Sequence, residues 1–257
     1  MAAAAPAPTV SEDSPSAVPS WLPLESNPEV LNPFCKRLGL PDGWGFTDVW
    51  GLDDELLMML PQPCVALCLL YPSTDISGPR REEIRTKVAA EAPPAPPAEL
   101  FFLQQHDGIG NACGTIASIH AIASGVAAGH YALESGSPLG AFMGSTSGLG
   151  IADRGWELTK ATALQELSDA TAAAGQTEGA GTDDAQNQHF ICFTCLGGTL
   201  YELDGRCFGS DGVAMPVNHG PSTPESFLGD AAKVIKEDFM TRTQSVNFNI
   251  TALCKLD

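Results

Sequence analysis

The chain contains 257 residues, enough for one domain with a substantial core plus appendages. Hydrophobic residues make up 44% of it, yet no apolar run is long enough to cross a bilayer, which predicts a soluble protein that does not insert into membranes. With 31 acidic and 13 basic residues the net charge is −18, which disfavours nucleic acid and anionic membranes, because their phosphates would be repelled, and favours a basic partner surface.

The first 19 residues are rich in Ala, Pro and Ser and show no periodic pattern. This composition predicts a disordered tail at 1–19, followed by a single domain at 20–257. The tail lacks the basic region and the long apolar stretch of a secretory signal. Eight cysteines over this length do not make a disulfide-dense scaffold, so we expect a reducing, cytoplasmic compartment.

Short helices and strands are predicted in the N-terminal part of the domain. A helix capped by Asn27 should end at Gly39, and a short strand is expected at 46–50. Asp53 is the expected cap of a second short helix. Residues 64–71 are apolar throughout, which is typical of a strand buried on both faces.

The middle of the chain is predicted to contain two long irregular connections. Residues 73–98 are expected to be an exposed connection whose charge run forms a solvated face, with basic residues at Arg80, Arg81, Arg85 and Lys87. A strand is expected at 101–103 and helices at 138–143 and 156–167. The stretch 169–188 has no apolar stripe, and a loop of that length inside a compact domain is functional or disordered.

The C-terminal third is predicted to be mostly antiparallel sheet. A hairpin over 189–205 turns at Gly197-Gly198, and a further short strand is possible at 215–217. A helix should follow to about residue 241, with its capping signal at Ser222, Thr223 and Glu225. Residues 246–252 alternate as a last strand, and helices around a mostly antiparallel sheet define an α+β fold.

One cysteine follows a turn rich in Gly and Asn and begins a helix. Cys113 should open a helix to about Ser124, with Asn111 as its N-cap. Unpaired N–H groups at a helix start favour negative charge, so a thiol placed there ionises more easily. The alternative is that Cys113 is simply one of eight cysteines and fills space as a small apolar residue. The turn by itself leaves both interpretations open.

A base and a carboxylate lie far downstream of that cysteine. His189 begins one strand of the predicted hairpin and Asp204 ends the other, fifteen residues later, so the two should lie side by side. A thiol, a base and an orienting carboxylate in this chain order form the papain-like arrangement for acyl transfer. This favours Cys113 as a nucleophile.

The remaining cysteines and histidines receive structural interpretations. Cys192 and Cys195 match a redox spacing, but residues three apart on a strand point to opposite faces and cannot close a disulfide or share a metal. No zinc-ligand spacing is present. We expect a core position for His120, exposed positions for His106 and His130, and a structural or site-lining position for His219.

Four blocks of this sequence resemble the ubiquitin C-terminal hydrolase family of cysteine peptidases. They are Asn111-Ala112-Cys113-Gly114-Thr115-Ile116, the strand that begins at His189, Leu200-Tyr201-Glu202-Leu203-Asp204-Gly205-Arg206, and Pro216-Val217-Asn218-His219-Gly220. Trp21-Leu22-Pro23-Leu24-Glu25 and Asn27-Pro28-Glu29 are similar to the family's N-terminal segment. The resemblance runs from about Trp21 to Asp257 and is nearest to small, single-domain members.

The resemblance implies a fold, a substrate and a set of roles. The fold would be a knotted papain-like domain whose active site is spanned by a crossover loop, here about 169–188. Cys113 would be the nucleophile, His189 the general base and acid, and Asp204 its orienter. Substrate contacts would come from Leu22, Pro23, Leu24, Asn111, Phe227 and Leu228. The substrate would be ubiquitin, or a ubiquitin-like protein, with a small C-terminal adduct, and we expect a monomer without cofactor or metal.

In this family the C-terminal tail of the substrate carries arginines before a terminal Gly-Gly. The excess of acidic residues in this chain would attract such a basic tail.

Two departures from the family pattern concern the site. The family's oxyanion-donating glutamine lies six residues before the cysteine, where this chain has Asp107; Gln105 lies eight before it, as though two residues were inserted. An ionised carboxylate would repel an oxyanion, so we assign the role to Gln105 and the Cys113 backbone N–H. The stretch 207–215 is also longer than the family norm.

Two other functions compete with hydrolysis. One is a ubiquitin-binding module that stabilises free ubiquitin because the altered turn impairs hydrolysis. The other is a thiol acyltransferase acting on a small molecule, against which the long loop and the acidic surface argue. The complete Cys–His–Asp set favours a hydrolase over both.

Overall fold

The computed structural model describes residues 20–175 and 187–256. The predicted tail at 1–19 and most of the predicted crossover loop therefore lie outside the described residues. The described part contains a six-stranded sheet in the order β1-β6-β2-β3-β4-β5, in which all neighbours pair antiparallel. The strands are β1 (Trp44–Asp48), β2 (Cys64–Pro72), β3 (Gln188–Leu196), β4 (Thr199–Leu203), β5 (Val217–Pro221) and β6 (Asn249–Lys255).

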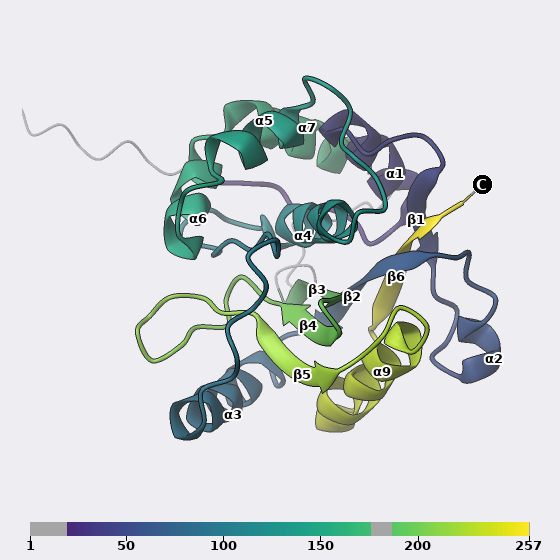
Figure 1. The fold of residues 1–257 in the computed structure, drawn as a ribbon, viewed down its shortest axis with the longest axis vertical. Coiled ribbons are helices and arrows are strands. Elements are labelled where there is room, and N and C mark those ends of the chain that lie inside the picture. The colour runs from purple at the N-terminus through teal and green to yellow at the C-terminus, as the bar shows by residue number, and fades with distance from the viewer. Residues whose placement is uncertain (1–19, 176–186, 257) are drawn as a thin grey trace, which may run out of the picture.

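Helices cover both faces of this sheet (Figure 1). On one side lie α1 (Pro28–Leu38), α4 (Cys113–Ala127), α5 (Pro138–Ser145), α6 (Ile151–Thr159) and α7 (Thr162–Ala173). On the other lie α2 (Asp54–Leu57), α3 (Ser77–Ala90) and α9 (Phe227–Val234), which continues as a π-helical segment, Ile235–Phe239, and a 3₁₀ turn, Met240–Arg242. None of the described helices is long and apolar enough to cross a membrane.

The strand β2 divides the hydrophobic core into two clusters. Ala66 and Cys68 belong to the cluster beneath α4, whereas Leu67, Leu69 and Tyr71 belong to the cluster beneath α9. This alternation follows from the period of two along a strand, and it confirms the predicted strand that is buried on both faces.

The helix α4 is the central support of the first cluster. Every residue from Gly114 to Gly125 is buried, as is typical of a helix enclosed on all sides. A side chain at Gly114 would lie 3.3 Å from the Phe190 ring of β3, so glycine permits the close approach of α4 to the sheet.

Most of the predicted elements are confirmed. Asn27 caps α1 by accepting a hydrogen bond from the Glu29 backbone N–H (2.9 Å), and Gly39 closes it in the left-handed conformation (φ 113°). The β3–β4 hairpin turns at Gly197-Gly198, both with positive φ. Two elements were misplaced: residues 101–103 form no strand, and the predicted helix 156–167 is divided between α6 and α7.

The largest error concerns 73–98, which was predicted to be a solvated connection. It contains the fourteen-residue helix α3, whose Arg80 is only 4% exposed. Arg80 Nη1 and Nη2 donate to the two carboxylate oxygens of Glu202 on β4, at 2.6 and 2.5 Å. His219 Nε2 donates to Glu202 Oε2 at 2.8 Å, and the Arg80 guanidinium lies 4.1 Å from the centre of the Phe239 ring.

A substitution on α3 tests whether this buried ion pair holds the helix to the sheet. Arg80→Met should lower the free energy of unfolding in urea by about 3–5 kcal/mol, because it leaves the Glu202 carboxylate buried with His219 as its remaining partner. The matched control is Arg85→Met on the same helix, whose ion pair with Glu82 is exposed and contributes at most about 1 kcal/mol. Equal losses for the two variants would contradict the structural role of Arg80.

Candidate functional site

The thiol of Cys113 lies at the first turn of α4 and is partly exposed. The predicted cap is wrong by one residue: Ala112 is the N-cap residue and forms no side-chain cap, because alanine has no acceptor. Asn111 lies one position earlier, where its backbone N–H donates to the Trp21 carbonyl at 3.0 Å. It lines both small pockets that flank the thiol.

The turn before Cys113 is held by the N-terminal segment. Trp21 N–H donates to the Ile109 carbonyl at 2.8 Å, and Trp21 forms a bridge with Gly110. Gly110 has φ 78°, and a Cβ there would lie 2.5 Å from the Ser20 hydroxyl, so only glycine fits. The same segment brings Pro23 and Leu24 to a pocket beside the thiol.

His189 and Asp204 meet as the hairpin geometry predicts. His189 Nε2 lies 2.7 Å from Asp204 Oδ1, and both side chains are less than 5% exposed. A carboxylate can only accept, so Nε2 carries the proton and Nδ1 remains for the thiol. Cys113 and His189 line one common pocket.

The surroundings lower the pKa of the Cys113 thiol and raise the pKa of the His189 imidazole. Burial by itself would raise the pKa of the Cys113 thiol, but the hydrogen bond and charge of His189 outweigh this and lower it. A backbone N–H at Phe190 and the charge of Arg206 lower it further. For His189 the effects have the opposite signs. Burial by itself would lower the pKa of the imidazole, but Asp204 and then the thiol raise it above its ordinary value. The site therefore favours a thiolate beside an imidazolium, which is a reactive nucleophile with its acid in place.

Three groups hold the carboxylate of Asp204. His189 and the backbone N–H of Arg206 (2.9 Å) donate to Oδ1, and Arg81 Nε donates to Oδ2 at 2.8 Å. Burial would raise the pKa of Asp204, but His189 and Arg81 lower it well below its usual range. The sequence prediction missed Arg81. The available signal was the pair of carboxylates Glu202 and Asp204 at the end of a buried strand, because buried carboxylates need charged or hydrogen-bonding partners and Arg80-Arg81 supplies two cations.

The two polar residues of the altered turn, Gln105 and Asp107, occupy different environments. Gln105 is 1% exposed, and its backbone N–H donates to the Gly205 carbonyl at 2.8 Å. A guanidinium only donates, so the amide oxygen of Gln105 faces Arg206 and accepts from Nη2 at 2.8 Å. Asp107 is exposed, whereas His106 next to it is buried.

Other histidines and cysteines are placed mainly by packing. His106 was predicted to be exposed but is 7% exposed, because its ring stacks on Trp156 at 3.8 Å and its Nε2 bonds to the Ala152 carbonyl at 2.7 Å. His120 is fully buried, and burial lowers its pKa to about 3. Cys192 belongs to the first core cluster and Cys195 packs against the second, so the two thiols face opposite sides of the sheet as predicted.

Two small pockets flank the thiol, one of about 90 Å³ and one of about 50 Å³. Of the predicted substrate contacts, Asn111, Pro23 and Leu24 line these pockets, and Leu22 is 45% exposed nearby in the chain. Phe227 is 1% exposed within the cluster beneath α9, so its burial does not support a substrate contact. Leu228 packs partly against the same cluster.

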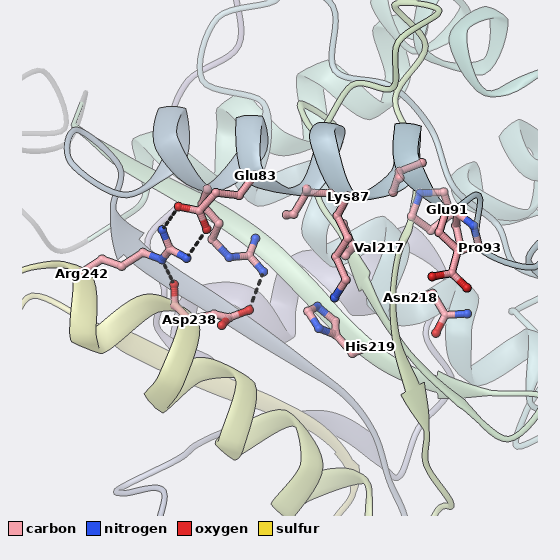
Figure 2. Close-up of a pocket in the computed structure, with 13 residues that line it drawn as sticks. Glu83, Lys87, Glu91, Pro93, Val217, Asn218, His219, Asp238 and Arg242 are labelled. Atoms are coloured by element: carbon pink, nitrogen blue, oxygen red, sulfur yellow. Dashed lines mark hydrogen bonds and ion pairs between the residues drawn. The ribbon is translucent and has the colours of Figure 1, made fainter.

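A larger cleft of about 270 Å³ lies along α3 and shares no lining residue with the pockets at Cys113. Figure 2 shows Lys87 and His219 directed toward each other across it, with Arg242 paired to Glu83. The hydrogen bond from His219 to the buried carboxylate of Glu202 holds the ring in place, so this histidine has a structural role. Across the described residues, no three His, Cys, Asp or Glu side chains cluster as metal ligands.

Comparisons with known proteins agree with this geometry. The family model described as "Ubiquitin carboxyl-terminal hydrolase, family 1" matches residues 21–240. Ubiquitin carboxyl-terminal hydrolase 3 of Arabidopsis thaliana is 40% identical over 252 residues, which are 96% of this chain and 98% of the relative. The human isozyme L1 is 41% identical over 235 residues, or 91% and 97% of the two chains.

Among solved structures, the catalytic domain of Trichinella spiralis UCH37, bound to ubiquitin vinyl methyl ester, matches with a TM-score of 0.66. Sequence identity is 21%, and the match covers 93% of this chain and 97% of that one. This likeness confirms the predicted α+β, papain-like fold. A family match over most of the chain, together with relatives that align along nearly their whole length, shows that this protein belongs to family 1 of the ubiquitin carboxyl-terminal hydrolases.

Proposed function

We propose that this protein is a thiol-dependent hydrolase that cleaves small adducts from the C-terminal glycine of ubiquitin. The observation that carries the proposal is the buried His189–Asp204 pair, 2.7 Å apart, beside the partly exposed thiol of Cys113. The names of the relatives, and the ubiquitin-derived ligand of the solved relative, point to the same substrate.

The groups of the site have the roles that acyl transfer requires. The Cys113 thiolate attacks the glycine carbonyl, and His189 gives its proton to the departing amine; His189 then activates the water that releases the acyl group. Asp204 fixes the imidazole in the productive tautomer. The Cys113 backbone N–H and the Gln105 amide are the proposed donors to the oxyanion. A complete set of these groups favours hydrolysis over a purely ubiquitin-binding role.

The setting of the reaction is part of the proposal. All eight cysteines lie in the described residues and none is in a disulfide, which supports a reducing compartment such as the cytoplasm. The net charge of −18 favours approach of a basic ubiquitin tail and supports a monomer that avoids nucleic acid and membranes. Release of a fluorophore from C-terminally amidated ubiquitin is the direct test.

The nucleophile assignment predicts a separation of binding from turnover. Cys113→Ala should abolish hydrolysis and leave the affinity for ubiquitin largely intact, because the thiol reacts but offers little contact area. Cys195→Ala, which removes the other partly exposed thiol, is the control and should retain activity. The assignment fails if Cys195→Ala is the inactive variant.

The role of Asp204 predicts a change in the pH profile as well as in the rate. kcat/KM should rise as the Cys113 thiol ionises and fall as His189 loses its proton. Asp204→Asn removes the charge that raises the His189 pKa, so the descending limb should move to lower pH while turnover falls roughly 10³–10⁴-fold. A wild-type profile with wild-type turnover would show that another group orients His189.

The altered turn predicts opposite effects for its two polar residues. Gln105→Ala should reduce turnover about 10²–10³-fold without weakening ubiquitin binding, because one oxyanion donor is lost. Asp107→Ala removes an exposed carboxylate and should be neutral or mildly activating. A severe Asp107→Ala with a silent Gln105→Ala would contradict the two-residue insertion.

A further inference from the structure

The two pockets beside Cys113 differ in chemistry. They share the Cys113 thiol, Asn111 and Gln188. The smaller pocket, about 50 Å³, is otherwise lined by apolar groups: Pro23, Leu24, Leu70 and Phe190. The larger, about 90 Å³, is otherwise lined by polar groups: Ser73, Ser77, Arg81, His189 and Arg206. The nucleophile therefore stands between an apolar cavity and a cationic one.

One cation that lines the 90 Å³ pocket has no carboxylate partner in the described part of the chain. No carboxylate lines this pocket. The charge of Arg81 is matched by Asp204, 2.8 Å away. In the part of the chain that the structure describes, no carboxylate lies within 4.0 Å of the partly exposed Arg206 side chain, which instead donates to the amide oxygen of Gln105. A guanidinium beside the nucleophile that has no carboxylate partner among the described residues is notable in a chain with a net charge of −18.

Arg81 also lines the pocket and carries one N–H group that forms no hydrogen bond with the described residues. Its Nη2 lies 2.8 Å from Asp204 Oδ2 but is not aligned for a hydrogen bond, and this buried atom has no hydrogen-bond partner. The hydroxyl groups of Ser73 and Ser77 complete a wall that offers donors to an anion. The pocket thus has the composition of a carboxylate-binding site.

The difference in polarity between the two pockets determines which part of a substrate lies on each side of the thiol. This step rests on the proposed function. The acyl part is a Gly-Gly segment preceded by arginines, as the family resemblance implies. Glycine backbone fits the narrow apolar pocket, whereas Arg81 and Arg206 would repel a basic tail from the other side. The departing amine then occupies the cationic pocket.

We propose that the 90 Å³ pocket is a leaving-group subsite that prefers amines carrying a carboxylate next to the scissile bond, with Arg206 as its anchor. A single amino acid with a free α-carboxylate is the simplest such group. In the reaction the C–N bond breaks, the amine departs with a proton from His189 and its carboxylate remains on Arg206 until release; water then hydrolyses the Cys113 thioester and returns the thiol.

Two substrates of equal shape test the charge preference. One is ubiquitin extended by a single glycine with a free carboxylate, and the other is the same extension ending in a carboxamide. The measured quantity is the ratio of kcat/KM for the carboxylate substrate to kcat/KM for the carboxamide substrate. This ratio should be about tenfold higher in the wild type than in Arg206→Gln, the factor that corresponds to a hydrogen bond between charged groups. The ratio in Arg206→Gln serves as the reference, because it contains the difference in reactivity that the two leaving amines have without Arg206.

Controls separate this inference from folding and from the proposed function. Arg206→Lys should keep part of the preference because it keeps the charge, and Arg85→Gln, on the exposed side of α3, should keep all of it. Raising the ionic strength should reduce the wild-type preference. The fraction of Cys113 that reacts with an electrophilic ubiquitin probe measures how much of each variant is correctly folded.

The outcomes are distinguishable. Equal substrate ratios in wild type and Arg206→Gln, or a wild-type ratio insensitive to salt, would overturn the subsite and leave the hydrolase intact. If the wild-type protein cleaves neither glycine substrate nor fluorogenic ubiquitin, the proposed function itself fails.

Discussion

The rest of the structure depends on the burial of two carboxylates at the end of β4, Glu202 within the strand and Asp204 directly after it. Glu202 and Asp204 are each no more than 1% exposed, and buried charges persist only when they are paired and hydrogen-bonded. α3 meets this requirement with consecutive residues: Arg80 binds Glu202 and Arg81 binds Asp204. One of these pairs fixes the helix to the sheet, and the other fixes the carboxylate that orients His189. Stability and catalytic geometry are therefore coupled through adjacent residues.

A second constraint places the thiol. α4 is enclosed on all sides, and its glycine at the first turn lets it approach the ring of Phe190, which follows His189 in β3. This close packing of the first turn of α4 against the strand that carries His189 holds the nucleophile beside its base. The N-terminal segment, bonded to the turn before Cys113, closes the other side of the site.

The parts of the site that follow from local patterns could be predicted from the sequence. Alternation and a Gly-Gly turn bring His189 and Asp204 to the same end of the hairpin, where they meet diagonally across it, because hairpin register is a local property. The role of α3 could not be predicted in the same way. Its sequence has a weak apolar stripe, and its burial depends on Glu202 and Asp204, more than a hundred residues later. The error at His106 has the same cause, since a distant aromatic ring, that of Trp156, covers it.

The position of β6 has a consequence for how the domain is assembled during synthesis. This strand pairs with both β1 and β2, so that Trp44 on the edge strand lies opposite Lys255, one of the last described residues. A chain emerging from the ribosome cannot complete its core until this strand is available. Contacts of such long sequence separation slow folding, because chain closure must precede the gain from burial. The domain that holds the reactive thiol therefore completes its sheet only after residue 255 has been synthesised.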